Sequence, residues 1–416
     1  MFTDDVLLEI CEKKMSRLKT FGIFTAGGIA ALTCSQAFQL YPFKIGDSEQ
    51  LSVKLEEPIP KLDYNKKYDF TNSINESIFK LDQWRVANTI PGYVIGISVK
   101  GRNVWLHGDG FADIENAIPC TPNTVMRIAS ISKSITAALL GKMLEEKKVY
   151  KPIREYLTPE QFPDKTWEDK KVDITLRQLV SHIVAKPGTK YVYTTYGWTL
   201  ISAVMESQMK DKNFSKAIKS FVNELGMKHT FVDENSPIIY NRASYYMFNK
   251  KTGKIENCPS VDNSSKIAGG GLLSTVGDLL RFGNLMLYSW KGTDPFGRPG
   301  YLDSKIVDQM WTPVETTFKS NSFGGYGIGW VSIRNESAKK AFAAEPRFST
   351  LFYHSGGAVG ASSLLIIEPE KEIVVAFITN MLSAKEMYRI VYDVTEIFSK
   401  QISGDSSLKI ATTSTS

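Results

Sequence analysis

Apolar residues recur at helical spacing in the segment that begins at Ile131. The later members of this series are Ile135, Leu139, Leu140, Met143 and Leu144. Intervals of three and four residues bring such positions onto one side of an α-helix. We therefore predict a helix that starts near Ser130 and buries one face against the rest of the protein.

Two runs near the C-terminus have the composition of strands. Residues 362–367 and 373–379 are rich in aliphatic and β-branched side chains, and the polar sequence from Glu368 to Lys371 separates them. A Pro-containing polar break between such runs is a turn signal, so we predict two strands joined by a turn. The two glycines between Tyr326 and Trp330 predict a further strand with close backbone approach.

A serine and a lysine stand three residues apart at the start of the predicted helix, at Ser130 and Lys133. At this spacing the two side chains are neighbours, and the helix N-terminus adds unpaired N–H groups and a positive dipole end. Partial burial lowers a lysine pKa enough for the amine to accept a serine proton at neutral pH. The pair predicts a nucleophile with its base.

The Ser-x-x-Lys spacing alone is weak evidence because the chain contains it six times. The six tetrads begin at Ser16, Ser77, Ser130, Ser207, Ser337 and Ser406. The context favours Ser130, since its tetrad leads into a long helix with an apolar face. The alternative is that Ser130 serves only as the N-cap of that helix.

Several ordered motifs between Ile90 and Lys133 resemble a known family. They are Ile90-Pro91-Gly92-Tyr93, Val104-Trp105, Gly110-Phe111-Ala112-Asp113, Pro119-Cys120-Thr121-Pro122 and the Ser130 tetrad. They resemble the mitochondrial serine β-lactamase-like proteins, relatives of class C β-lactamases and penicillin-binding proteins, and the resemblance extends from about Tyr68 to about Ser399. It implies peptide bond hydrolysis in mitochondria, a link to lipid metabolism and self-assembly into oligomers or filaments.

The resemblance assigns a second motif to Tyr193 and Thr195. A phenol hydrogen-bonded to Lys133 could carry the serine proton to the leaving group. Thr195 stands where class C enzymes usually have asparagine, and its single hydroxyl offers fewer hydrogen bonds than a carboxamide. The alternative is that Tyr191, Tyr193 and Tyr196 pack in the core with their hydroxyls at its edge.

The third motif of the family is assigned to His354, Ser355 and Gly357. The literal Lys-Thr-Gly at residues 251–253 lies in a polar, turn-like sequence and is predicted to be a hairpin tip. By resemblance, the strand with His354 and Ser355 flanks the active site, and the N–H groups of Gly357 and Ser130 form an oxyanion hole.

His354 stands where classical β-lactamases have a lysine. The exchange removes a fixed positive charge that could bind a substrate carboxylate, which disfavours efficient β-lactam hydrolysis and favours peptide or ester substrates. The alternative is that His354 is a core or edge histidine without a role in binding.

The chain after His182 is shorter than the resemblance implies. Only residues 183–186 separate it from Pro187-Gly188, so a Ser-His-Thr-Ser-Gly type of turn and the cleft-covering segment after it are missing. We expect an open site with strain around Tyr193, because a short connection limits where the next element can lie. A non-catalytic scaffold that self-assembles is therefore a second hypothesis from another class.

The composition describes an ordinary globular chain. It has 416 residues, of which 43% are hydrophobic and 23% are charged, enough for one large domain. A net charge of +6 from dispersed residues argues against nucleic-acid binding. The four cysteines, at positions 11, 34, 120 and 258, lack the paired spacing of a zinc site or a disulfide scaffold. The predicted mechanism requires no metal and no organic cofactor.

Both ends of the chain differ from its middle. Phe21–Phe38 is uncharged and follows several basic residues, so residues 1–67 are predicted to be a targeting or anchor segment with a linker. A buried helix is the alternative, and the acidic residues among the first twelve are unlike a mitochondrial presequence. The small, polar residues 403–416 predict a disordered tail.

Together these observations predict an α+β serine hydrolase domain over residues 68–402, of the serine β-lactamase/transpeptidase type. An antiparallel sheet of N-terminal and C-terminal strands would be backed by terminal helices near 72–86 and 384–399, and would face a helical region that carries Ser130. Ser130 would form an acyl-enzyme that water releases. A small-ester hydrolase shares this mechanism, so the substrate remains open.

Overall fold

The computed structural model describes residues 69–143, 151–184, 186–318, 324–334 and 347–404. The predicted anchor at Phe21–Phe38 and the tail from residue 405 lie outside these residues. Within the described part of the chain, no helix combines the length and apolar character needed to cross a membrane.

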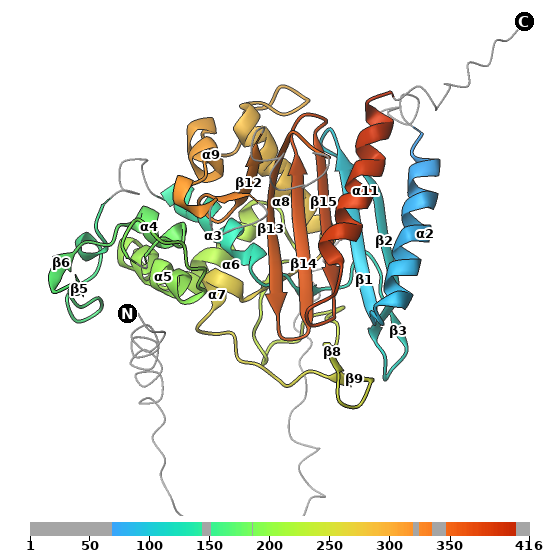
Figure 1. The fold of residues 1–416 in the computed structure, drawn as a ribbon, viewed down its shortest axis with the longest axis horizontal. Coiled ribbons are helices and arrows are strands. Elements are labelled where there is room, and N and C mark those ends of the chain that lie inside the picture. The colour runs from blue at the N-terminus through green and yellow to red at the C-terminus, as the bar shows by residue number, and fades with distance from the viewer. Residues whose placement is uncertain (1–68, 144–150, 185, 319–323, 335–346, 405–416) are drawn as a thin grey trace, which may run out of the picture. The chain divides into compact units, whose positions relative to one another are not determined.

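The centre of the domain is an eight-stranded antiparallel sheet (Figure 1). Its strands, in spatial order, are β11 (Gly325–Tyr326), β12 (Val331–Arg334), β13 (Thr350–Ala358), β14 (Ala361–Glu368), β15 (Ile373–Thr379), β1 (Gly92–Val99), β2 (Arg102–Asp113) and β3 (Ile118–Pro119). β1 pairs with β15 along its length, from Tyr93 opposite Thr379 to Val99 opposite Ile373. N-terminal and C-terminal strands of the described domain thus share one sheet, as the sequence predicted.

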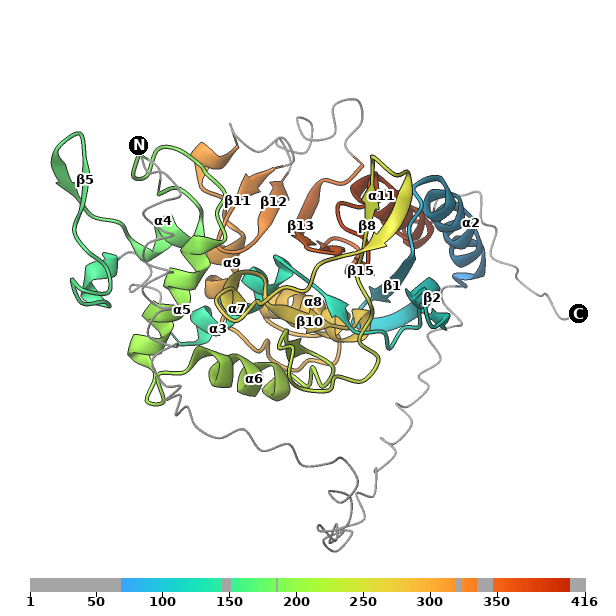
Figure 2. The same cartoon turned by 90° about the horizontal axis from the view of Figure 1, so that it is seen from below.

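Helices cover both faces of this sheet. α2 (Thr71–Ala87) and α11 (Met387–Ile402) lie side by side on one face, and α8 (Val276–Lys291) packs on the other face (Figure 2). This is why β1, β14 and β15 are buried at every residue. The predicted terminal helices and C-terminal strands are confirmed to within three residues at each end.

The helical region lies on the α8 side of the sheet. Its elements are α3 (Ile131–Met143), η4 (Ile153–Glu155), α4 (Leu176–Val180), α5 (Tyr196–Gln208), α6 (Phe214–Glu224), α7 (Ile267–Gly270), α9 (Ser304–Trp311) and η5 (Glu315–Thr317). A small sheet joins β4 (Met126–Arg127), β10 (Leu272–Ser274) and β7 (Phe231–Val232), and β5 (Lys165–Trp167) pairs with β6 (Lys170–Val172). β8 (Tyr246–Asn249) and β9 (Lys254–Asn257) form a hairpin with Lys251–Gly253 at its tip, which confirms that prediction.

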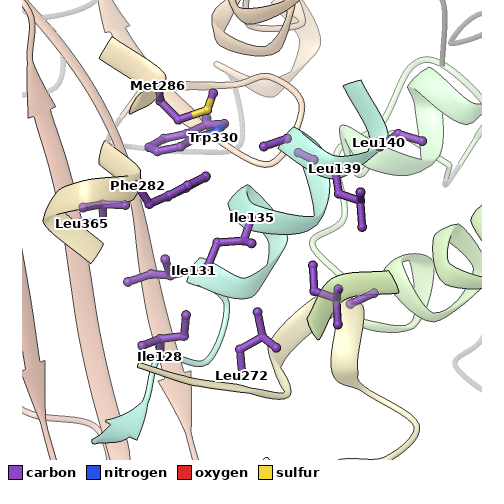
Figure 3. Packing of buried hydrophobic residues seen from close by; sticks show 14 of the residues in the cluster. Ile128, Ile131, Ile135, Leu139, Leu140, Leu272, Phe282, Met286, Trp330 and Leu365 are labelled. Atoms are coloured by element: carbon purple, nitrogen blue, oxygen red, sulfur yellow. The ribbon is translucent and has the colours of Figure 1, made fainter. Parts of the chain in front are cut away.

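α3 is the central helix of this region, and the prediction that it buries one face was wrong. Every residue from Ile131 to Leu140 is buried, because the helix lies between the large sheet and the surrounding helices (Figure 3). Its polar side chains are satisfied by backbone partners: Ser134 donates to the Gly329 carbonyl at 2.7 Å and Thr136 to the Ala268 carbonyl at 2.9 Å. A helix that is enclosed on all sides retains polar groups only when they are paired in this way.

The predicted strand from Tyr326 to Trp330 was also wrong in part. β11 ends at Tyr326, and the Gly327 N–H donates to the Trp330 carbonyl at 2.8 Å in a tight turn. Gly329 has a φ of 69°, which favours glycine, and a Cβ on Gly327 would lie 2.1 Å from the Met310 carbonyl oxygen. The close backbone approach is therefore present, but it occurs in a turn rather than along a strand.

Candidate active site

Ser130 lies directly before α3, at the end of a strained connection. Ala129, the residue before it, has a φ of 48°, a conformation that side-chain-bearing residues adopt only at an energetic cost. Lys133 Nζ lies 2.9 Å from Ser130 Oγ. The structure thus brings the predicted nucleophile and base within hydrogen-bonding distance.

Lys133 is completely buried, although it is a lysine. Its Nζ also donates to the Gly269 carbonyl oxygen at 2.6 Å. Burial disfavours the charged ammonium and lowers the Lys133 pKa from its ordinary value of 10.5 to about 7. A lysine with this pKa is partly in the neutral, proton-accepting form at neutral pH.

Tyr193 completes the group around Ser130, but its contact with Lys133 differs from the predicted hydrogen bond. Lys133 Nζ lies over the Tyr193 ring, 5.0 Å from the ring centroid. The residue as a whole is 43% exposed, yet its hydroxyl is desolvated and hydrogen-bonded to Ser130. Burial raises the pKa of Tyr193 to about 12 and the Ser130 hydroxyl opposes this shift, so the phenol is protonated at neutral pH.

His354 is a buried, neutral side chain beside this group. Its Nδ1 lies 2.7 Å from the Ser355 carbonyl oxygen and its Nε2 lies 2.8 Å from the Tyr326 hydroxyl. A carbonyl can only accept, so Nδ1 carries the hydrogen and Nε2 accepts from Tyr326. Burial, with a smaller contribution from Lys133, lowers the His354 pKa to about 3.

A close approach of β13 to the segment that leads to Ser130 explains Gly356. A Cβ on Gly356 would lie 2.1 Å from Ser363 Oγ and 2.3 Å from the Ile128 carbonyl oxygen, so no side chain fits there. A Cβ on the next residue, Gly357, would meet nothing within 4 Å. The predicted oxyanion residue therefore borders open space, while its neighbour holds the strand against the segment that leads to Ser130.

The side chain of Ser355 contacts the C-terminal helix α11. Side chains alternate along a strand, so Ser355 and His354 lie on opposite faces of β13. The Ser355 hydroxyl lies 2.5 Å from the Tyr388 hydroxyl of α11, which donates to it. The Ser355 hydroxyl is therefore held by α11, and Tyr388 lies near enough to Tyr193 to contribute to its raised pKa.

Thr195 lies at the start of α5, next to the carbonyl group that holds Lys133. Its Cγ2 would be 2.9 Å from a Cβ placed on Gly269. The Thr195 carbonyl accepts the first hydrogen bond of α5 from Trp198, at 3.0 Å. The threonine thus packs its methyl group against Gly269, at the rim of the Lys133 environment.

His182 also lies in the site, although the sequence analysis did not predict it as a site residue. In the sequence it was noted only as the residue before the short segment 183–186. It is fully buried, and its ring centroid lies 4.4 Å from that of Tyr193 and 4.9 Å from that of Tyr326. Burial, then Lys133 and His354, holds the His182 pKa well below its usual range. In the sequence, His182, Tyr193 and Tyr326 lie in three separate segments. No local pattern indicates that folding brings their rings together.

Burial, rather than a neighbouring carboxylate, sets the protonation states of Lys133, His182 and His354. Burial lowers the pKa of Lys133, and Lys133 in turn disfavours charge on His182 and His354.

Across the described residues, no group of three or more His, Cys, Asp or Glu side chains is arranged to hold a metal ion. This fold, nucleophile and base define the class of serine β-lactamase-like hydrolases.

Comparison with known sequences agrees with this class. Residues 80–393 match the family model described as Beta-lactamase, so the chain belongs to the β-lactamase family. The human serine beta-lactamase-like protein LACTB, mitochondrial, is 33% identical, over 68% of this chain and 69% of the human protein. Its counterpart from Mus musculus is 32% identical, over 73% of this chain and 74% of the mouse protein.

Solved structures show the same fold. The octameric penicillin-binding protein homologue from Pyrococcus abyssi superimposes with a TM-score of 0.64 at 21% identity, over 78% of this chain and 77% of that protein. A class C beta-lactamase superimposes with a TM-score of 0.62 at 18% identity, over 79% of this chain and 96% of that enzyme. The predicted α+β, β-lactamase/transpeptidase-like fold is thereby confirmed.

Proposed function

We propose that this protein is an active serine hydrolase that cleaves peptide bonds through an acyl-enzyme on Ser130. The observation that carries the proposal is the 2.9 Å contact between Ser130 Oγ and a buried lysine whose pKa is about 7. A hydroxyl alone does not lose its proton at neutral pH, whereas one beside a neutral amine can become a nucleophile.

The proposed reaction has two halves. Lys133 accepts the Ser130 proton as Oγ attacks the carbonyl carbon, and the N–H groups of Ser130 and Gly357 stabilise the oxyanion. Tyr193, protonated at neutral pH, gives its proton to the departing amine, and the proton on Lys133 restores it. Water then attacks the acyl-enzyme with Lys133 again as base, which releases the acid and free Ser130.

The charge of the site supports the choice of substrate. His354 is neutral because its pKa is about 3, so it cannot bind a carboxylate as a fixed cation would. This favours the carbonyl of a peptide or small ester over a β-lactam that carries a carboxylate. A small-ester hydrolase would use the same residues, and comparative turnover of matched peptide and ester substrates distinguishes the two.

The proposal extends to the place of the protein in the cell. The human and mouse relatives are named as mitochondrial proteins, so we propose a mitochondrial location. Membrane anchoring through Phe21–Phe38 is proposed from the uncharged sequence of that segment, and a role in lipid metabolism is proposed from the family resemblance alone. Assembly into homo-oligomers or filaments is part of the same proposal. Organelle fractionation of the full chain and of a chain without residues 1–67 tests the location and the anchoring, and light scattering of the purified protein tests the assembly.

The scaffold hypothesis makes the opposite prediction about chemistry. The scaffold hypothesis is supported by the short segment after His182, which lacks the expected cleft-covering part. The close arrangement of Ser130, Lys133 and Tyr193 supports an active nucleophile instead. Purified protein should be treated with a fluorophosphonate probe, beside Ser130→Ala and Tyr193→Phe variants, and the label located by peptide mapping. Labelling at Ser130 that Ser130→Ala abolishes supports the hydrolase. A folded chain that takes up no label favours the scaffold.

A further inference from the structure

We infer that His182 is a positioning residue that fixes the place of Tyr193 by accepting a hydrogen bond from the residue after it. The inference rests on the proposed function, in which Tyr193 transfers a proton near Ser130. It assigns a role to a buried histidine outside the Ser130, Lys133 and Tyr193 group.

His182 binds both neighbours of Tyr193 in the chain. The Val192 N–H donates to the His182 carbonyl oxygen at 2.8 Å. The Thr194 N–H donates to His182 Nδ1 at 3.2 Å. One residue thus holds the backbone on each side of Tyr193, while its ring lies 4.4 Å from the Tyr193 ring.

The geometry also assigns the tautomer of His182. A neutral imidazole has one acceptor nitrogen, and Nδ1 takes that role because the Thr194 N–H points to it. The indole N–H of Trp198 also points to the ring, at Nε2, but its 3.4 Å distance is longer than the Thr194 contact, so we take Nδ1 as the acceptor and Nε2 as the protonated nitrogen. The Nδ1 bond to Thr194 is therefore the shorter of the two polar contacts of the side chain.

Tyr193 needs such support because its own packing is incomplete. With 43% of its surface exposed, it is not enclosed as a core tyrosine is. The other aromatic rings near it are more distant, with the Tyr326 centroid at 6.1 Å and the His354 centroid at 6.5 Å. Removal of the Thr194 bond would leave the ring free to move relative to Ser130.

His182 itself lies in a strained backbone conformation. Its φ is 59°, in the left-handed region, where glycine and asparagine are the least costly residues. Shortly after it, the Gly188 N–H donates to the Ile183 carbonyl at 2.9 Å and reverses the chain. A histidine at this turn is explained by its side-chain bond, since the backbone conformation alone would favour a smaller residue.

The test compares two substitutions that both tolerate a positive φ. His182→Asn places an amide oxygen near the position of Nδ1 and can accept from Thr194, whereas His182→Gly cannot. We expect the rate of fluorophosphonate labelling at Ser130 to fall about tenfold to a hundredfold in His182→Gly. In His182→Asn it should stay within about threefold of the parent protein.

A double-mutant cycle separates positioning from general loss of structure. If His182 acts through Tyr193, His182→Gly should slow labelling little further when Tyr193 is already phenylalanine and its hydroxyl is gone. Full additivity of the two losses would overturn the inference. Labelling of a folded His182→Gly protein at the parent rate would overturn it as well.

Amide hydrogen exchange keeps the inference testable if the proposed function fails. The Thr194 amide should exchange slowly in the parent and in His182→Asn, and faster in His182→Gly, whatever the activity. Absence of labelling in the parent would refute the proposed function, whereas equal Thr194 exchange in the parent and His182→Gly would refute the positioning role.

Discussion

At the scale of single residues, Lys133 carries the clearest consequence. Because its pKa is about 7, the neutral base becomes more abundant as the pH rises through that value. The rate of Ser130 labelling should therefore increase with pH and level off above about pH 7. Lys133→Ala should lower the plateau about a hundredfold to ten-thousandfold. A parent profile that is flat across this range would exclude Lys133 as the base.

The same pKa predicts a dependence of stability on pH. The unfolded chain keeps Lys133 protonated up to about pH 10, whereas the folded protein loses the proton near pH 7. Between these values the unfolded state binds more protons, so the free energy of unfolding should rise with pH. Urea denaturation at about pH 7 and about pH 9 should show a larger gain for the parent than for Lys133→Met, which lacks the titrating group. Equal gains would contradict the lowered pKa.

Gly356 and Gly357 are adjacent glycines that serve as a test and its control, because Gly356 is tightly packed and Gly357 borders open space. Gly356→Ala should destabilise the fold by about 1–3 kcal/mol or more, because its Cβ would overlap Ser363 and the Ile128 carbonyl. Gly357→Ala should leave thermal stability nearly unchanged, since nothing lies within 4 Å of its Cβ. Calorimetry of both variants tests the close approach of β13 to the nucleophile segment, and comparable destabilisation of both would contradict it.

At the scale of elements, the buried Arg127 connects the nucleophile segment to the residue after β7 through an ion pair and to the β13–β14 hairpin through a hydrogen bond. Arg127 Nε lies 2.7 Å from Asp233 Oδ2, and its guanidinium also donates to the Val359 carbonyl at 2.8 Å. Arg127→Met would leave Asp233 buried without its cation and should destabilise the protein by about 3–5 kcal/mol. Urea denaturation measures this effect.

The control for Arg127 is an exposed ion pair elsewhere on the domain. Lys216 pairs with Asp211, and both side chains are mostly solvent-accessible. Lys216→Met should change the free energy of unfolding by less than about 1 kcal/mol. Similar losses in the two variants would mean that the Arg127 pair contributes no more than a surface pair.

α11 attaches to the large sheet through aromatic side chains. Phe398 is completely buried, and its ring lies 5.3 Å from Phe70 and 6.0 Å from Trp105, measured between centroids. Phe398→Ala should cost about 3–5 kcal/mol. Phe79→Ala, on the same face of the domain but 62% exposed, should cost much less. A small loss at Phe398 in thermal unfolding would contradict tight docking of α11.

At the scale of the whole molecule, most features set by residues close together in sequence were predicted correctly, whereas several features set by residues far apart in sequence were not. The strands 362–367 and 373–379 were predictable because β-branched composition and a polar break are local signals. The enclosure of α3 was not, since helical spacing reveals an apolar side but does not reveal partners on the remaining sides. The turn after Tyr326 was missed because glycine pairs occur in turns and in strands alike.

The sequence alone therefore determined the elements with strong local patterns, the Ser130 and Lys133 pair on one helix and, through ordered motifs, the family. Spacing within a helix fixes which residues are neighbours, so this pair required no knowledge of the remaining chain. Only the tertiary structure decided that Lys133 is buried with a pKa of about 7, that Ser355 faces α11, and that His182 lies against Tyr193. Burial and desolvation depend on segments that are distant in sequence, which is why local patterns could not give them.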